Sequence, residues 1–140
     1  WNGSKLQFFV DDTNVGELSD ERVKSEIIEV NENLISIAEE LEFKQFKLAN
    51  RDGKISVGVI AQELLKLFEK YNVNPDDFDI TYNGQFNLTD ETIYHFVNYE
   101  QLLILQTLVL KRKVEKQEAK INYIIEKLGI AEEMEELLNG

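Results

Sequence analysis

A serine and a lysine five residues apart, Ser19 and Lys24, are the side chains of this sequence best suited to chemistry. Serine is a poor nucleophile until a base removes its proton. A lysine can be that base only if burial or a nearby cation lowers its pKa from about 10.4 toward neutrality. Such a pair needs no cysteine, histidine or metal, and the chain has no cysteine and one histidine. A Ser/Lys pair is therefore one of the few hydrolytic arrangements open to this chain.

The same segment also suits the start of a helix. Ser19 is a good N-cap, and Asp20 and Glu21 suit the positive end of a helix dipole. From Asp20 onward, apolar residues recur at alternating spacings of 4 and 3, and this heptad pattern predicts a helix about 30 Å long. The stripe consists of Val23, Ile27, Val30, Leu34, Ile37 and Leu41.

The predicted helix creates a geometric difficulty for the Ser/Lys pair. Five residues along a helix turn through about 500°, so Ser19 and Lys24 would point about 140° apart. Two solutions remain open at this point. Either Ser19 lies outside the helix as its cap, or Lys24 serves the serine of a neighbouring chain.

The rest of the chain up to residue 96 reads as short strands and one amphipathic helix. Asp52-Gly53 supplies the positive φ angles of a turn between two antiparallel strands. In chain order we expect a strand at Lys5–Asp12, a loop at Asp11–Glu17, a hairpin of Phe43–Leu48 and Ile55–Ile60, a helix at Ala61–Tyr71, a turn at Asn74–Asp77, and short strands around Tyr82 and Phe86.

A second heptad stripe, over residues 103–128, predicts a coiled coil. It runs through Leu103, Thr107, Leu110, Val114, Gln117, Ile121, Ile124 and Leu128. A polar Gln117 at a core position is typical of residues that specify register, and Ile121 and Ile124 favour three strands over two. The alternative is one helix that packs this stripe along a globular core. Residues 129–140 read as a short acidic tail.

Composition narrows the classes of function. The 140 residues make one domain, or one domain with an appendage, and the start at Trp1 reads as a fragment cut from something longer. A net charge of −12 disfavours nucleic acids and anionic membranes as partners. The absence of cysteine fits folding in the cytosol. No metal or other cofactor is expected, because Asp76, Asp77 and Asp79 lack calcium-loop spacing. His95 is expected to be a packed aromatic residue.

Three motifs occur in order around the two heptad helices: Ser19-Asp20-Glu21-Arg22-Val23-Lys24, then Gly58-Val59-Ile60-Ala61-Gln62-Glu63, then Val97-Asn98-Tyr99-Glu100-Gln101-Leu102. From about Leu18 to Leu128 the chain resembles the self-cleaving intramolecular chaperone domains at the C-terminus of phage tailspikes, endosialidases and neck-appendage proteins. The same domain type occurs in the myelin regulatory factor. Two features depart from the family pattern: Asn98, where aspartate is usual, and the acidic tail after Gly129.

The resemblance implies an α+β fold with long heptad-patterned helices, a small β-hairpin region, and an intertwined homotrimer with a C-terminal coiled coil. Residues 1–17 would be the end of an upstream fibre and its linker, and residues 18–140 the chaperone domain. That domain would guide folding of the upstream β-rich fibre of the same polypeptide. It would then cut itself off in the host cytoplasm during virion assembly, and the fibre would enter the virion tail or appendage.

The resemblance also assigns the site of a self-cleaving serine peptidase. Ser19 is carried over as nucleophile and Lys24 as general base, with the cut at the Ser19–Asp20 bond. Attack of Ser19 on its own carbonyl would need a four-membered ring, whereas attack on the carbonyl of Leu18 forms a five-membered ring and would cut Leu18–Ser19. Arg22 has four candidate roles: holding Asp20, polarising the scissile carbonyl, lowering the lysine pKa, or simple solvation.

Two residues of the second motif could support the site. Gln62 and Glu63 are candidates to orient the cleavage loop, although helix capping and solvation explain them equally well. Tyr99 is expected to anchor the long helix. Two other functions remain open: a permanent trimerisation module that never cleaves, and a monomeric acidic adaptor for a basic partner protein.

Overall fold

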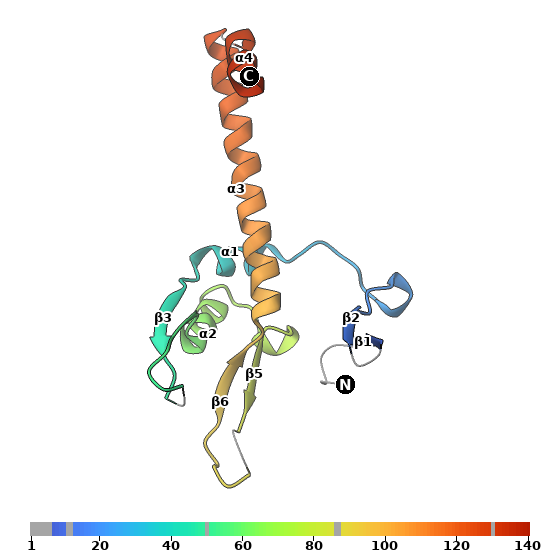
Figure 1. Ribbon diagram of the computed structural model, residues 1–140, viewed down its shortest axis with the longest axis vertical. Coiled ribbons are helices and arrows are strands. Elements are labelled where there is room, and N and C mark those ends of the chain that lie inside the picture. Colours follow the sequence, from blue (N-terminus) through green and yellow to red (C-terminus); the bar gives the residue numbers. More distant parts are fainter. Residues whose placement is uncertain (1–6, 11–12, 50, 86–87, 130) are drawn as a thin grey trace.

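A computed structural model of the chain describes residues 7–10, 13–49, 51–85, 88–129 and 131–140. Helices and small antiparallel hairpins form a compact base, from which one long helix rises, whereas the N-terminal hairpin lies apart at the end of an extended segment (Figure 1). The predicted α+β class is confirmed. The elements are β1 (Gln7–Val10), β2 (Thr13–Glu17), η1 (Glu21–Val23), α1 (Glu32–Glu40), β3 (Lys44–Lys47), β4 (Ile55–Gly58), α2 (Ala61–Lys70), η2 (Pro75–Asp77), β5 (Thr81–Gly84), β6 (Tyr94–Val97), α3 (Tyr99–Leu128) and α4 (Ala131–Asn139).

The core lies where α1, α2 and the first turns of α3 meet. Its most deeply buried large side chains are Ile37 of α1, Leu64 and Phe68 of α2, and Leu102 of α3. Each such side chain contributes about 1.5–3 kcal/mol when it is fully removed from water. Gln106 of α3 adds a polar link, because its Nε2 donates to the carbonyl of Ala38 at 2.7 Å. The base is thus a three-helix core with hairpins attached.

The first predicted helix is wrong over its N-terminal half. Helix α1 begins at Glu32, capped by the Asn31 side chain, which accepts from the Asn33 N–H at 2.8 Å. Between β2 and α1 the chain forms the single turn η1 and an extended linker, with Glu26 at φ 51° (Figure 1). An isolated short helix is marginal in water without tertiary packing. Val23 and Ile27 of the stripe are 61% and 69% exposed, so this chain offers them no such packing.

The hairpins match the expected pattern in part. β3 and β4 pair as predicted, from Lys44↔Gly58 to Lys47↔Ile55, with Asp52 and Gly53 at positive φ. η2 confirms the predicted turn. β5 confirms the strand around Tyr82, whereas its partner β6 was not predicted and Phe86 lies outside the described residues.

The N-terminal hairpin corrects one further expectation. β1 falls within the predicted strand, but the predicted loop at Asp11–Glu17 contains β2, which pairs antiparallel with β1. A short segment of Thr, Asn and Gly shows no strand period of its own. Hydrogen bonding to β1 makes it a strand, and that pairing is not visible in the local sequence.

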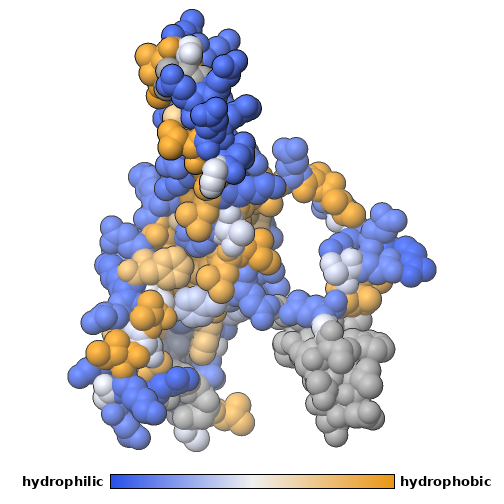
Figure 2. Space-filling model, turned by 45° about the horizontal axis from the view of Figure 1, so that its top comes forward, coloured by the Kyte–Doolittle hydropathy of each residue, from blue (hydrophilic) through white to orange (hydrophobic). Residues whose placement is uncertain are grey.

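The long helix is confirmed and begins before the predicted start, at Tyr99. Its heptad stripe does not enter the core: Leu103, Leu110, Val114, Ile121, Ile124 and Leu128 are all 50–64% exposed. A different face of α3, carrying Leu102, Leu105 and Val109, contacts the base. The alternative in which the stripe packs along a globular core is therefore wrong. Hydrophobic patches interrupt the hydrophilic surface of both the long helix and the base (Figure 2).

The end of the chain is also helical. Gly129 closes α3 in the left-handed conformation, with φ 66°, and the acidic tail that follows contains α4. Among the described residues, no helix is both long and apolar enough to cross a bilayer.

Candidate functional site

The turn η1 brings Ser19 and Lys24 into contact within one chain. Lys24 Nζ donates to Ser19 Oγ at 2.7 Å. The turn is closed by the Lys24 N–H, which donates to the carbonyl of Glu21 at 3.1 Å, and the backbone of Lys24 continues extended. The angular difficulty posed by a continuous helix does not arise, because the segment is not an α-helix. Ser19 is not the cap; Asp20 is, since its side chain accepts from the Arg22 N–H.

Arg22 and Asp20 hold this turn together. The guanidinium donates through Nε to Asp20 Oδ1 at 2.9 Å and through Nη2 to Asp20 Oδ2 at 2.6 Å. Such a two-pronged pair is geometrically specific. The Arg22 side chain, followed by the Arg22 N–H, lowers the pKa of the Asp20 carboxyl below its ordinary 3.8. Of the roles considered for Arg22, holding Asp20 is the one this geometry displays.

The pair lies in open solvent on the single chain. Ser19 and Lys24 are both exposed, as are their neighbours in the segment apart from the half-buried Asp20. In the contact described, the lysine donates, whereas a general base must accept the serine proton at the same distance. A lysine amine becomes a base of that kind when it is withdrawn from water. The single chain thus supplies the contact but not the burial that the chemistry requires.

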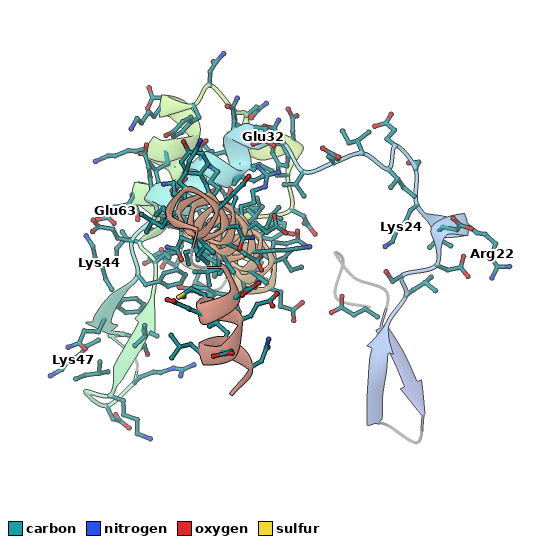
Figure 3. All side chains as sticks on the ribbon, turned by 90° about the horizontal axis from the view of Figure 1, so that it is seen from above. Arg22, Lys24, Glu32, Lys44, Lys47 and Glu63 are labelled. Atoms are coloured by element: carbon teal, nitrogen blue, oxygen red, sulfur yellow. The ribbon has the colours of Figure 1, made fainter. Side chains whose placement is uncertain are left out.

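The two supporting candidates lie elsewhere on the chain. Glu63 accepts a hydrogen bond from Lys44 at 2.7 Å, and this bond raises the pKa of Lys44. Figure 3 shows Glu63 and Lys44 on the far side of the molecule from Lys24. Gln62 is exposed in the first turn of α2 and lines a surface pocket of about 500 Å³ together with Tyr99. Within one chain, neither residue meets Ser19, so their role at the cleavage loop stays a prediction.

A contact that sequence reasoning missed joins the second and third motifs. The Tyr99 hydroxyl accepts from the Val59 N–H at 3.1 Å, and a Cβ at Gly58 would lie 2.2 Å from that hydroxyl oxygen. Position 58 therefore requires a glycine, because the phenol ring of Tyr99 lies against its backbone. The expectation that Tyr99 anchors the long helix is confirmed.

Asn98 performs two tasks at the start of α3. Its Oδ1 accepts from the Gln101 N–H at 3.4 Å, and its Nδ2 donates to the carbonyl of Asp79 at 3.0 Å. An ionised aspartate could make the first bond but not the second, because it has no hydrogen to donate. The departure from the family pattern at this position thus adds a link between α3 and the segment before β5.

His95 differs from its expected role. It is exposed on β6, and its Nδ1 lies 2.6 Å from Asn83 Oδ1 across the hairpin. It lines a cleft of about 420 Å³ that Asp76, Asp77 and Asp79 also line. Among the described residues, no group of three or more His, Cys, Asp or Glu side chains is placed to hold a metal ion.

The motif that contains Ser19 and Lys24 lies inside a segment shared with known proteins. Residues 19–72 match the model of the family Peptidase_S74, described as chaperone of endosialidase. The resemblance to intramolecular chaperone domains is confirmed. The matched segment contains the first two motifs and the core helices α1 and α2, but not α3. No curated protein sequence matches the chain at a significant level.

The fold resembles that of a solved intramolecular chaperone. A crystal structure of a novel intramolecular chaperone shares 20% identity over 70% of this chain and 99% of its own, with a TM-score of 0.60. At this identity the likeness shows the fold alone. The carboxy-terminal domain of the bacteriophage T5 L-shaped tail fibre, with its chaperone domain, shares 15% identity over 93% of this chain but 36% of its own, with a TM-score of 0.48.

Proposed function

We propose that this chain is a self-cleaving intramolecular chaperone that trimerises and guides folding of an upstream β-rich phage fibre or appendage of the same polypeptide. One observation carries the proposal: inside the segment that matches the family, Lys24 Nζ reaches Ser19 Oγ at 2.7 Å. In this proposal residues 1–17 are the end of the fibre and its linker, and residues 18–140 are the chaperone. Folding and cleavage take place in the host cytoplasm during virion assembly.

The exposed heptad stripe of α3 supports assembly into a trimer. Six large apolar side chains of that stripe are at least half exposed on the single chain, and a soluble helix gains from covering such a seam with copies of itself. Residues 103–128 would form the coiled coil of three chains. Linked in this way, the upstream segments would meet at millimolar effective concentration.

Trimerisation through a helix suits the folding problem of a β-rich fibre. Strands paired between chains make non-local contacts, which form slowly. Helices form from local contacts and fold fast, so a helical clamp can set the register before the strands pair. Once the clamp is severed, the fibre loses the element through which it could unravel and becomes kinetically trapped.

The cleavage chemistry starts with the neutral amine of Lys24 taking the Ser19 hydroxyl proton. In one route Ser19 Oγ attacks the Leu18 carbonyl carbon, the C–N bond breaks, and the Ser19 nitrogen leaves with the proton from Lys24. Water then hydrolyses the ester and frees the Leu18 carboxylate. In the other route, which cuts the Ser19–Asp20 bond to which the resemblance points, Ser19 Oγ of a neighbouring chain attacks the Ser19 carbonyl carbon and the Asp20 nitrogen leaves with the proton. Water then hydrolyses the ester between the two chains and frees the Ser19 carboxylate. The mass of the released fragment distinguishes the two bonds.

Assembly would also supply the burial that the pair lacks. The segment from Leu18 to Ile27 extends away from the base and is exposed almost throughout on one chain (Figure 1). Covering this arm with a neighbouring copy would withdraw the amine of Lys24 from water and make the cut depend on trimer formation. Gln62 and Glu63 of a neighbour are candidates to contact the arm there.

The contact within one chain leads us to infer that Lys24 serves its own Ser19. Mixed trimers of Ser19→Ala and Lys24→Ala chains test this point. If Lys24 deprotonates only the Ser19 of its own chain, neither kind of chain in a mixed trimer is cut. Cleavage of the Lys24→Ala chain would instead show that the lysine of a neighbour can serve its serine.

The proposed function is tested by incubating the chain and measuring its mass. The wild type should lose its N-terminal fragment, whereas Ser19→Ala and Lys24→Ala should stay intact. Ser25→Ala is the matched control, since Ser25 is an exposed serine of the same segment and should leave cleavage unchanged. A wild type that forms trimers but never cleaves would favour the permanent trimerisation module instead. A monomer would favour the acidic adaptor.

A further inference from the structure

We propose that α4 of one copy lies across α3 of the neighbouring copy, where it covers an apolar cup lined by Ala119, Lys120, Tyr123 and Ile124. This inference rests on the proposed trimer. It assigns a role to the acidic tail, which departs from the family pattern. The tail would be a clasp that ties adjacent helices together at the tip of the coiled coil.

The chemistry of α4 fits a docking helix. Its apolar residues Leu137 and Leu138 are 76% and 74% exposed, whereas Met134 is half-buried. The other side chains include Glu132, Glu133, Glu135 and Glu136, with no basic residue among Ala131–Asn139. An exposed leucine pair on an acidic helix favours a partner surface that is apolar at its centre and basic at its edge.

α3 carries such a surface beside its seam. Lys116, Lys120, Tyr123 and Lys127 follow one another at spacings of 4, 3 and 4, so they lie on one face of the helix. We call these four residues the basic flank. Tyr123 is 61% exposed and its ring lies 5.6 Å from Lys127 Nζ. The cup beside it has a volume of about 370 Å³ and is open on the single chain.

The geometry points to a neighbouring copy as the occupant. α4 leaves the end of α3 sideways, at the level of the last turns of α3 (Figures 1 and 3). Among the described residues of its own chain, none covers the leucine pair or closes the cup. Helices in a coiled coil lie roughly 8–10 Å apart, and the nine residues of α4 extend about 14 Å. A sideways helix of this length reaches the adjacent α3.

The chain contains no cysteine, so engineered cysteines report this contact cleanly. The test variant is Ala119→Cys with Leu138→Cys, treated with a short bismaleimide and run on a denaturing gel. We expect dimer and trimer bands from cross-links between chains. The matched control is Lys111→Cys with Leu138→Cys, which places the thiol on the same helix but more than two turns below the cup. Loss of most of the cross-linked product is expected there.

Sedimentation of each variant before cross-linking separates the two proposals. A trimer with cross-links between chains supports the clasp. A trimer that cross-links only within single chains, or no more than the control, overturns the clasp and leaves the proposed trimer standing. A monomer overturns both. Adding Leu137→Ser to the test variant should cut the yield of cross-linked trimer several-fold if Leu137 packs against the neighbouring α3.

Discussion

At the scale of single residues, the approach of Tyr99 to Gly58 leaves no space for a larger side chain at position 58. A methyl group at Gly58 would lie 2.2 Å from the Tyr99 hydroxyl oxygen, so Gly58→Ala must displace the phenol. We expect Gly58→Ala to lower the free energy of unfolding by about 1–3 kcal/mol, as overpacking does elsewhere. Chemical denaturation measures this change.

A double-mutant cycle checks the cause. Tyr99→Phe removes the acceptor of the part-buried Val59 N–H and should itself cost about 1–3 kcal/mol. In the Gly58→Ala, Tyr99→Phe double variant, the closest clash is removed, and the nearest contact of the methyl group becomes the ring carbon Cζ of residue 99 at 3.0 Å. Its loss of stability should therefore be smaller than the sum of the two single losses. Strict additivity would show that the two residues do not act through one contact.

The clamp between Asp20 and Arg22 makes a prediction about pH. Arg22 lowers the pKa of Asp20, so the clamp stabilises the turn above the ordinary value of 3.8 and is lost as pH falls through the lower folded value. The NMR signal of the Arg22 Nε–H should thus stay protected from exchange with water at pH 4 and above, and lose protection in stronger acid. Loss of protection already near neutral pH would contradict the clamp.

Substitution at Arg22 tests whether the clamp positions the Ser/Lys pair. Lysine keeps the charge but cannot donate through two fixed nitrogens. Arg22→Lys should therefore slow self-cleavage several-fold at neutral pH without changing which bond is cut, as followed by mass spectrometry. If both Arg22→Lys and Arg22→Ala cleave at the wild-type rate, Arg22 does not position the Ser/Lys pair and is only a solvated surface residue.

At the scale of the elements, Glu40 links α1 to α2. Its carboxylate accepts from Lys70 Nζ at 2.8 and 2.9 Å and from the Tyr71 hydroxyl. The bond from Lys70, followed by that from Tyr71, lowers the pKa of Glu40 below its ordinary 4.5. The link therefore stabilises the fold above that value and is lost as pH falls through the folded pKa.

Glu40→Gln should lower the melting temperature modestly at neutral pH, because exposed ion pairs contribute little. The difference from the wild type should shrink as the pH falls through the lowered pKa of Glu40, where the wild-type carboxyl takes up its proton. Glu69→Gln, at an exposed position of α2, is the control and should leave the melting temperature nearly unchanged. A loss that persisted undiminished in acid would point to packing rather than to charge.

At the scale of the whole molecule, the exposed seam of α3 should govern assembly and not the fold of each chain. Ile121 and Ile124 are 50% and 52% exposed and do not belong to the core. Charges at both positions would repel one another along a coiled coil. We expect Ile121→Lys with Ile124→Lys to abolish the trimer in sedimentation experiments and to leave the base folded. Glu118→Lys, off the seam, should remain trimeric. A trimer that survived the double change would exclude the seam as the interface.

The sequence predicted an element best where its apolar residues recur with a single period and pack into the core of the same chain. α2 was predicted almost to its bounds, because Leu64 and Phe68 are buried at helical spacing by the same chain. The first heptad stripe was misread over its first half. Leu34, Ile37 and Leu41 reach the core, but Val23 and Ile27 have the same period and no surface in this chain to cover them. Periodicity shows which side chains would share a face and not whether a partner is present.

The sequence by itself determined the two residues of the candidate site, the α+β class, the hairpin at Asp52-Gly53 and the long C-terminal helix. These depend on residue type, turn chemistry and local spacing, which act within a few residues of one another. Only the tertiary structure decided that a single turn brings Lys24 to Ser19 and that Tyr99 lies on Gly58. It also decided that α3 turns Leu102, and not Leu103, toward the base. The first depends on the backbone angles of one turn, which a pattern of apolar spacing does not report. The other two depend on which surfaces of a folded chain meet, and contacts between distant segments leave no local period to read.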